Sequence, residues 1–203
     1  AGIERVGATE EVPLEDFRAV METNYFGAIR CIRAVIPTMR RRRSGCIINV
    51  ASISGRLAAS PMGPYAASKF ALEAMSECLA QEVKPFNVRV AIVEPGITDT
   101  QMATRISVVP GSSQYPGPGR MAALYRGVLM HPIPPTLVAE KVLEIAVGSS
   151  WQLRHLVGPD AAPFLAWRQA MSDEEWVAFG ALDDDAWYAR VKADFGIDAR
   201  PHA

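Results

Sequence analysis

The run CIINVAS at residues 46–52 carries almost no polar side chain, and the run VRVAIVEPG at 88–96 repeats this pattern. Between them lies YAASKFALEAMSECLAQEV at 65–83, a strong helical pattern that ends close to Pro85. Short apolar runs rich in β-branched residues are typical of strands buried on both faces, as in a parallel sheet. The order strand, helix, strand therefore predicts one repeat of a doubly wound α/β fold.

Toward the N-terminus, the segment between Pro13 and Met39 has apolar residues at helical spacing and predicts one or two helices. The four arginines at 40–43 suit a helix C-terminus, where cations complement the helix dipole, and Gly45 then permits the stop. A nucleic-acid or membrane patch is the less favoured interpretation of these arginines.

Toward the C-terminus, residues 101–135 are rich in proline and glycine and predict a long irregular excursion with one helix near 121–130. Long loops of this kind often act as lids. We expect a helix over 136–147 with Thr136 as its N-cap, a short strand over 154–157 and a helix over 160–171. A capping box at 172–175 opens another helical segment toward Phe195. The chain is thus predicted to be one domain over 1–203, with a substrate lid at 101–135 and a helical tail at 160–203.

The composition excludes several classes of protein. The chain has 203 residues, 49% of them hydrophobic and 21% charged, with a formal net charge of −1. These values are typical of a globular domain and exclude collagen-like, coiled-coil and disordered chains. The near-zero net charge argues against a nucleic-acid binder, and no apolar run reaches the roughly 18 residues of a membrane span. The opening residues contain no apolar stretch typical of a signal peptide, so we expect a cytoplasmic protein.

The cysteines and histidines do not predict a metal or redox site. Three cysteines, at 31, 46 and 78, form no CxxC pair, and we expect them to be reduced and buried. The three histidines, at 131, 155 and 202, are too scattered for a helical zinc motif. We therefore expect no metal ion in this protein.

Three polar features converge at the predicted carboxyl edge of the sheet. Ser52 lies just past the first strand, and Pro95-Gly96 ends the second. Tyr65 and Lys69 are one turn apart on the helix between them, so that both side chains lie on one face. A lysine ammonium next to a phenol favours the phenolate, which lets the tyrosine exchange a proton with an alcohol or alkoxide. The alternative is a half-buried tyrosine and a surface lysine, because the pair alone is weak evidence.

With these motifs in place, the chain resembles the classical short-chain dehydrogenase/reductase family, a Rossmann-fold group of NAD(P)-dependent oxidoreductases. The YxxxK motif of that family matches Tyr65 to Lys69, and its active-site serine matches Ser52 in INVASISG. Its asparagine matches Asn24 in NYFG, and its PG-x-x-x-T segment matches 95–100. The resemblance is consistent from residue 1 to about 100 and looser to about 160.

The resemblance implies a role for each of these residues. Ser52 is expected to position the substrate oxygen, and Tyr65 to act as general acid/base. Lys69 is expected to lower the pKa of Tyr65 and to bind the nicotinamide ribose, and Asn24 to support a water-mediated proton relay. NAD or NADP is the implied cofactor, with the choice between them open. The residues expected to contact it are Tyr65 and Lys69 together with Ala1, Gly2, Pro95, Gly96, Thr98 and Thr100.

The resemblance also predicts that the chain is N-terminally incomplete. Ala1-Gly2 matches the last two letters of the NNAG motif of the family, so the preceding strand–helix units and the glycine-rich pyrophosphate turn are expected upstream. A natural short form without that turn is the alternative. Residues 117–122, GPGRMA, formally fit GxGxxA, but no strand is predicted before them and proline occupies the turn. We interpret them as a chance match.

The expected reaction is the interconversion of an alcohol and a carbonyl by a small-molecule enzyme. The sequence around the motifs resembles the subgroup that acts on steroids and retinoids, so we expect a lipophilic substrate. Apolar lid residues would suit it: Met102, Ile106, Met121, Leu124 and Leu129. We also expect a homodimer or homotetramer, because the helices at 24–40 and 65–83 correspond to those that form dimer interfaces in the family. The alternatives are a non-catalytic protein with a binding or oligomerisation role and, less favoured, an epimerase or dehydratase acting on nucleotide sugars.

Overall fold

Three parallel strands form the centre of the molecule. The computed structural model describes residues 2–108 and 113–200. The strands are β1 (Gly45–Val50), β2 (Val88–Pro95) and β3 (Arg154–Val157), in the spatial order β1-β2-β3. Gly45 lies opposite Val88, and Ile92 lies opposite Arg154, so that the carboxyl ends of the strands meet at one edge of the sheet. The predicted parallel α/β fold is confirmed.

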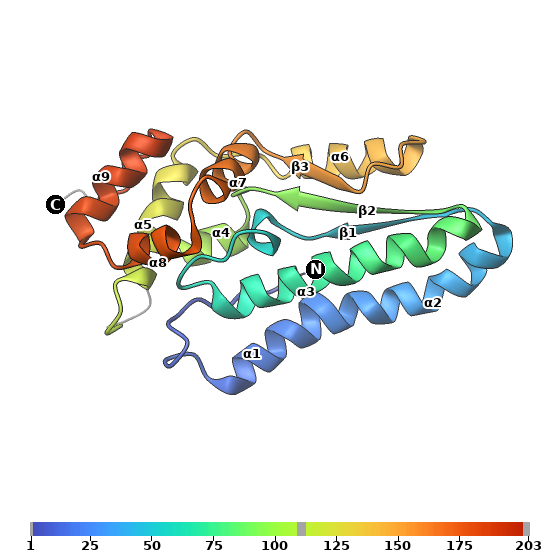
Figure 1. Ribbon diagram of the computed structural model, residues 1–203, viewed down its shortest axis with the longest axis horizontal. Helices are drawn as coiled ribbons and strands as arrows, with labels where there is room; N and C mark the ends of the chain where they lie inside the picture. The colour runs from blue at the N-terminus through green and yellow to red at the C-terminus, as the bar shows by residue number, and fades with distance from the viewer. Residues whose placement is uncertain (1, 109–112, 201–203) are drawn as a thin grey trace.

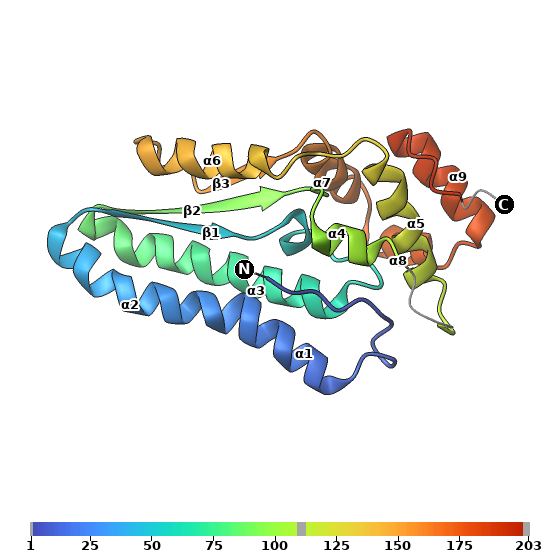
Figure 2. The same ribbon diagram turned by 180° about the vertical axis from the view of Figure 1, so that it is seen from behind.

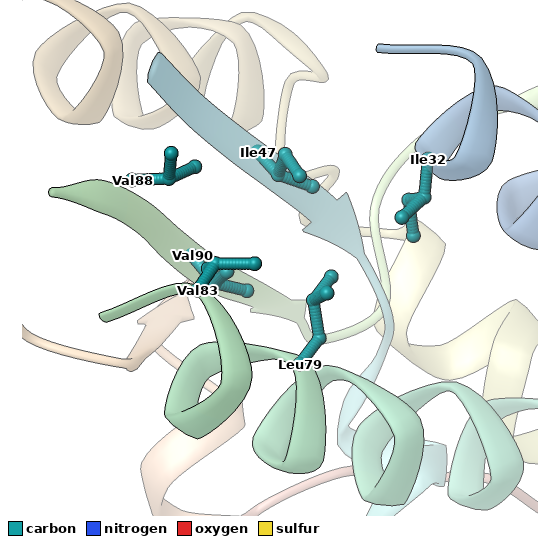
Figure 3. Close-up of a cluster of buried hydrophobic side chains, with 6 residues drawn as sticks. All are labelled: Ile32, Ile47, Leu79, Val83, Val88 and Val90. Atoms are coloured by element: carbon teal, nitrogen blue, oxygen red, sulfur yellow. The ribbon is translucent and has the colours of Figure 1, made fainter. Parts of the chain in front are cut away.

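Helices cover both faces of the sheet (Figures 1 and 2). The helices α2 (Gly27–Arg42) and α3 (Gly63–Val83) lie on one face, and α6 (Thr136–Val147) lies on the other. On the first face, strand residues pack against apolar side chains of both helices (Figure 3). This cluster consists of Ile32, Ile47, Leu79, Val83, Val88 and Val90. On the second face, Ala91 and Val93 pack with Ile145 of α6. The result is the three-layer arrangement of a doubly wound fold.

The two long strands differ in how completely they are buried. In β2, Ile92 and Val93 are fully buried, which confirms the prediction of a strand covered on both faces. The strand β1 lies at one edge of the described sheet, and Val50 at its end is 45% exposed. The prediction of burial on both faces is therefore wrong for β1, because Ile47 and Asn49 on one face are buried while Cys46 and Ile48 on the other face are only partly covered.

The segment before β1 is one continuous helical stretch with a wider turn in its middle. The helix α1 (Leu14–Met21) leads into a π-helical turn over Glu22–Phe26, which continues directly into α2. The arginines at 40–42 occupy the last turn of α2, as predicted. Arg43, with φ of 50°, takes the left-handed conformation that ends the helix. The predicted role of Gly45 is therefore wrong, since Gly45 is already the first residue of β1.

The proline-rich excursion contains more helix than the sequence predicts. The helix α5 (Gly117–Leu129) is the expected one, although it begins earlier than expected. A second helix, α4 (Gln101–Ile106), has the hydroxyl of Thr100 as its N-cap, with the Thr100 Oγ1 atom accepting from the Ala103 amide at 3.3 Å. Residues 109–112 of the predicted lid lie outside the described residues.

The C-terminal elements follow the sequence closely. The bounds of α6 and β3 are those predicted, but Pro135 rather than Thr136 occupies the N-cap position, since Thr136 is already helical. The expected helix at 160–171 is α7 (Ala161–Gln169). The capping box at Ser172 is confirmed, and the segment that it opens forms two helices, α8 (Asp173–Gly180) and α9 (Asp184–Phe195).

Two of the three cysteines are not buried. Cys31 on α2 and Cys78 on α3 are exposed and Cys46 is half-buried, so the expectation of buried thiols is wrong for Cys31 and Cys78. Among residues 2–108 and 113–200, no helix is both long and apolar enough to cross a membrane. The same residues contain no group of His, Cys, Asp and Glu side chains arranged to hold a metal ion.

Candidate active site

Ser52 lies at the carboxyl edge of the sheet, two residues after the end of β1. It is the N-cap of a short 3-10 turn, Ile53–Gly55, and its Oγ atom accepts from the Ser54 amide at 3.1 Å. The same oxygen lies 3.5 Å from the carbonyl oxygen of Pro95, at the end of β2. The hydroxyl is thus held between the ends of two neighbouring strands, where the sequence predicts it.

Tyr65 and Lys69 lie in the first turns of α3, and both are buried. The Lys69 Nζ atom donates a hydrogen bond of 2.9 Å to the carbonyl oxygen of Val50 at the end of β1. It lies 5.5 Å from the centroid of the Tyr65 ring. The predicted common face is confirmed, and the two side chains meet Ser52 at the same edge.

Burial is the main cause of the pKa shifts of Tyr65 and Lys69. It raises the pKa of Tyr65, with the hydrogen bond from Ser52 acting in the opposite direction and the charge of Glu4 adding to the rise. Burial also lowers the pKa of Lys69 to about 8, while the carboxylate of Glu73 opposes this change. The net shift of Tyr65 is opposite to the one expected from Lys69 alone, because burial outweighs its hydrogen bond. The Tyr65 phenol therefore keeps its proton at neutral pH and is available as a donor.

Asn24 is buried in the π-helical turn and binds the N-terminal segment. Its Oδ1 atom accepts from the Ile3 amide at 2.9 Å, and its Nδ2 atom donates to the Ile3 carbonyl at 2.8 Å. The same Nδ2 atom donates to the hydroxyl of Ser68, next to Lys69, at 3.0 Å. Asn24 thus fixes residues 2–4 against α3, and its expected part in a proton relay stays a prediction.

The residues after β2 form a tight turn at the same edge as Ser52. Gly96 has no room for a side chain, because a Cβ atom there would come within 2.1 Å of an Asp160 oxygen. The Ile97 amide donates to Asp160 at 2.7 Å, and the Thr98 hydroxyl lies 3.4 Å from the Gly96 carbonyl. The structure therefore brings the segment at 95–100 next to the reactive residues. Thr100, which caps α4, is the exposed last residue of the segment at 95–100.

Of the two N-terminal residues expected near the cofactor, one is described. A Cβ atom on Gly2 would lie 3.4 Å from Asn24 Oδ1, so Gly2 lies beside the buried amide. Ala1 lies outside the described residues.

We call Ser52, Tyr65, Lys69 and Pro95–Gly96 the reactive wall.

A cavity of about 390 Å³ lies beside the reactive wall, with Ser52, Gly96 and Ile97 among its lining residues. Aromatic side chains of α7, α8 and α9 also line this cavity. We call this set the aromatic wall; it consists of Phe164, Trp167, Trp176, Phe179, Trp187 and Phe195. These helices lie beyond the carboxyl ends of the strands in Figure 1.

The aromatic wall is held together by ring contacts and by two polar anchors. Trp167 contacts the ring edges of Trp176, Phe179 and Phe195, with centroids 5.0 to 5.4 Å apart. The Trp176 indole donates to the carbonyl of Ala58 at 3.0 Å, which fastens α8 to the loop after the 3-10 turn.

The second anchor is the buried guanidinium of Arg120 on α5. It donates to the Asp184 carboxylate at 2.8 Å and to the carbonyls of Gly180 and Leu182 at 3.3 and 2.6 Å. Arg120 therefore joins α5 to the connection between α8 and α9.

The sequence prediction of the cavity lining was partly right. Met121 and Leu124 line the cavity, whereas Met102 and Ile106 pack with Met121 in an apolar cluster. Leu129 is outside the cavity lining. The aromatic wall was missed, although Phe164 and Trp167, like Trp176 and Phe179, stand three residues apart at helical spacing. The chance motif at 117–122 forms the start of α5, and the element before it among the described residues is the helix α4 rather than a strand.

Comparison with known proteins agrees with this geometry. The sequence model of the family described as short chain dehydrogenase matches residues 1–108. The chain belongs to the short chain dehydrogenase family. It is 34% identical over 182 residues to oxidoreductase BOA17 of Botryotinia fuckeliana. This alignment covers 87% of this chain and 66% of that protein. It is 38% identical over 117 residues to human retinol dehydrogenase 8. This second alignment covers 58% of this chain and 38% of that protein.

Two solved structures of short chain dehydrogenases are similar over nearly the whole chain. One is from Streptomyces avermitilis, with a TM-score of 0.69 and 30% identity over 95% of this chain and 65% of that one. The other, from Burkholderia cenocepacia J2315 in complex with NADP, has a TM-score of 0.64 and 29% identity over 94% and 65%. The chain spans less than two thirds of the length of each of these four proteins.

Proposed function

We propose that this protein is an NAD(P)-dependent oxidoreductase that interconverts an alcohol and a carbonyl. One observation supports this most strongly: Lys69 Nζ lies 5.5 Å from the ring of a buried Tyr65 that is hydrogen-bonded to Ser52, and Ser52 lines the cavity. The relatives named as oxidoreductase and retinol dehydrogenase support the same reaction class.

Each residue of the reactive wall has a chemical task in this proposal. The Ser52 hydroxyl, fixed between two strand ends, donates a hydrogen bond to the substrate oxygen. The Tyr65 phenol, protonated at neutral pH, gives its proton to that oxygen as negative charge develops, and takes a proton back in the oxidative direction. The Lys69 ammonium stabilises the resulting phenolate by its charge. Asn24 keeps α3 and the N-terminal segment in register behind these groups.

The residues at this edge fit a nicotinamide cofactor. The buried Lys69 ammonium and the Thr98 hydroxyl are suitable donors to a ribose and to a carboxamide, and both lie next to Tyr65 or to the tight turn at Gly96. Pro95, Thr100, Gly2 and Ala1 complete the proposed contacts. When bound, NAD or NADP supplies or accepts the hydride. The NADP complex of the Burkholderia relative supports this cofactor class, and the choice between NAD and NADP stays open.

The substrate is proposed to be lipophilic, because the aromatic wall gives the cavity a mainly apolar lining. We also propose that the segment at 101–135 covers this cavity as a lid, with Met121 and Leu124 facing the substrate.

We infer further that the protein is a cytoplasmic homodimer or homotetramer that uses α2 and α3 as its interface. Val35 on α2 and Phe70 on α3 are 41% and 42% exposed, which supports a contact surface on both helices.

The test is the binding of NADH and NADPH, followed by turnover. We expect binding of at least one of them, seen as a change in nicotinamide fluorescence and a rise in melting temperature. Thr98→Val is expected to weaken binding, and Thr104→Val, on the exposed side of α4, to leave it unchanged. Failure of both cofactors to bind would overturn the proposal and favour the alternative of a non-catalytic binding or oligomerisation role.

A further inference from the structure

Two carboxyl groups are buried behind the reactive wall. Glu94 is the last residue but one of β2 and is fully buried, although its strand is otherwise apolar apart from Arg89. Glu73 is on α3, one turn after Lys69, and is 4% exposed. Carboxylates are almost never buried to this degree without strong partners, so these two groups need an explanation.

The available cations satisfy only part of this pair. Arg154 on β3 donates to Glu73 Oε2 at 3.0 Å and to Glu77 Oε2, on the exposed side of α3, at 2.6 Å. Glu94 Oε1 lies 3.8 Å from Arg154 Nε and 3.6 Å from Arg56 Nη1, which are long ion contacts. Within residues 2–108 and 113–200, neither Glu94 oxygen accepts a hydrogen bond, nor does Glu73 Oε1.

A proton between the two carboxyl groups removes this difficulty. A protonated carboxyl group is a donor, so one proton between Glu73 and Glu94 would bridge them and leave one negative charge instead of two. Burial and the charge of Glu94 raise the pKa of Glu73 to about 7, although Arg154 acts against this rise. Oxygens of Glu73 and Glu94 lie 3.0 and 3.8 Å from the same atom, Arg154 Nε. Two buried carboxylates this near to one another behave in this way because like charges in a low dielectric resist joint ionisation.

The pair is coupled to the reactive wall through Lys69. The charge of Glu73 raises the pKa of Lys69 and so opposes the effect of burial on that ammonium. The charged groups around the pair are Lys69 on α3, Arg154 on β3, which also contacts Glu77 of α3, and Arg56 after the 3-10 turn, which contacts Glu94. Of these, Lys69 alone belongs to the reactive wall.

The pair also packs against the turn that begins at Ser52. A Cβ atom on Gly55 would lie 2.8 Å from Glu73 Cγ and 3.1 Å from the Lys69 carbonyl oxygen. The helix that carries Lys69 and the turn that carries Ser52 therefore meet at Glu73.

We propose that Glu73 and Glu94 share one proton, and that Glu73 is a positioning residue that keeps Lys69 charged as the pH rises. When the pair releases its proton, the new negative charge stabilises the Lys69 ammonium in the pH range in which burial favours its neutral form. The consequence for catalysis rests on the proposed function; the shared proton and its coupling to Lys69 do not.

The coupling is tested by NMR titration of ¹³Cε-labelled lysine. The chain has four lysines, at 69, 84, 141 and 192, so a Lys69→Arg variant assigns the signal. We expect a pKa of about 8 for Lys69 in the native protein. Glu73→Gln is expected to lower it by about 0.5 to 1 unit, the effect of removing one charge at this spacing in a partly buried site. Glu77→Gln, on the same helix but exposed, is the matched control. An unchanged Lys69 titration in folded Glu73→Gln would overturn the coupling.

The shared proton is tested by infrared spectroscopy of the carboxylic-acid carbonyl band. The native protein is expected to show a buried protonated carboxyl at pH 6.5, which disappears in Glu73→Gln and, independently, in Glu94→Gln. Circular dichroism checks the fold, and either folded variant is sufficient for the test. Absence of the band from the native protein, or its persistence in a folded variant, would overturn the proposal.

The pH dependence of turnover then separates this inference from the proposed function. In Glu73→Gln the fall of kcat on the alkaline side is expected to begin at lower pH, by the shift that NMR measures for Lys69. A protein without turnover refutes the proposed function and leaves the NMR and infrared results to decide the inference. Normal turnover with an unshifted profile and an unshifted Lys69 refutes the inference alone.

Discussion

The reactive wall and the aromatic wall differ in the chemistry of their residues. The reactive wall lies at strand ends and at the start of α3, where Ser52 and Lys69 are held by hydrogen bonds to backbone. The aromatic wall consists of rings on three helices that contact one another. The family model matches residues 1–108, which contain the reactive wall, whereas the aromatic wall lies beyond them.

This difference indicates that the two walls have separate roles in the reaction and in substrate selection. Strand ends of a parallel sheet are rigid, so they hold reacting groups at fixed distances and directions. Helices added after the sheet change the shape of the cavity without moving those groups. The reactive wall is therefore expected to set the reaction, and the aromatic wall to set which substrate enters. Variants in each wall test this division.

The largest effect is expected at the reactive wall, in Tyr65→Phe. Loss of the phenol oxygen removes the proton donor, so kcat should fall by about 10² to 10⁴-fold, the usual range for a general acid/base. Cofactor affinity and melting temperature should stay close to native, as measured by steady-state kinetics and thermal unfolding. Tyr188→Phe, on α9 and away from the cavity lining, is the matched control. Retained turnover in Tyr65→Phe would remove this residue from the acid/base role.

The next effect is expected in the support of the aromatic wall, in Arg120→Met. The change removes three hydrogen bonds and leaves the carbonyls of Gly180 and Leu182 without their donor. We expect a loss of about 3 kcal/mol in the free energy of unfolding, measured by denaturant titration. Arg126→Met, on the same helix and exposed, should cost less than about 1 kcal/mol. Equal losses in both variants would contradict the anchoring role of Arg120.

A third prediction concerns pH, which should affect the reactive side and leave the aromatic side unchanged. The pKa of Glu73 is raised from 4.5 to about 7, so the folded protein binds this proton more tightly than the unfolded chain. Its contribution to stability is complete below pH 4.5 and is lost as the pH rises through 7, with a slope of at most about 1.4 kcal/mol per pH unit for one proton. Unfolding measured across this range should lose that slope in Glu73→Gln and keep it in Glu77→Gln. The same slope in both variants would contradict the assignment.

The smallest effect is expected in Trp176→Phe, which keeps an aromatic ring and removes the hydrogen bond to Ala58. We expect a loss of about 1 kcal/mol in unfolding free energy and a rise of KM for an apolar substrate, with kcat nearly unchanged. Trp151→Phe is the control, because Trp151 is 43% exposed and lies in the loop before β3. A fall in kcat with constant KM would show that the two walls do not act separately.

The reactive wall was predictable from sequence, and the aromatic wall was not. Ser52, Tyr65 and Lys69 are close in the chain and lie on one strand–loop–helix unit, so local spacing fixes their relative positions. The aromatic wall joins three helices whose packing depends on long-range contacts, such as the bond from Trp176 to Ala58. Spacing identifies its members but not the surface that they share.

Smaller errors have local causes. Arg43 rather than Gly45 ends α2, since a left-handed residue is required two positions before the strand begins. The prolines and glycines of 101–135 suggested an irregular segment from residue 101 onward, but the Thr100 cap starts the helix α4 there. The buried carboxyl pair could have been detected from sequence through Glu94, because a carboxylate in an apolar strand requires a buried partner. That partner is Glu73.

The most direct test of the whole account is hydride transfer itself. The protein would be incubated with a bulky apolar ketone and with NADH or NADPH that carries deuterium at both C4 positions of the nicotinamide, and the alcohol formed would be analysed by mass spectrometry. The account predicts deuterium at the carbinol carbon in the native protein with at least one cofactor, and a loss of this product in Tyr65→Phe. Native protein that binds cofactor and ketone but transfers no deuterium would contradict it.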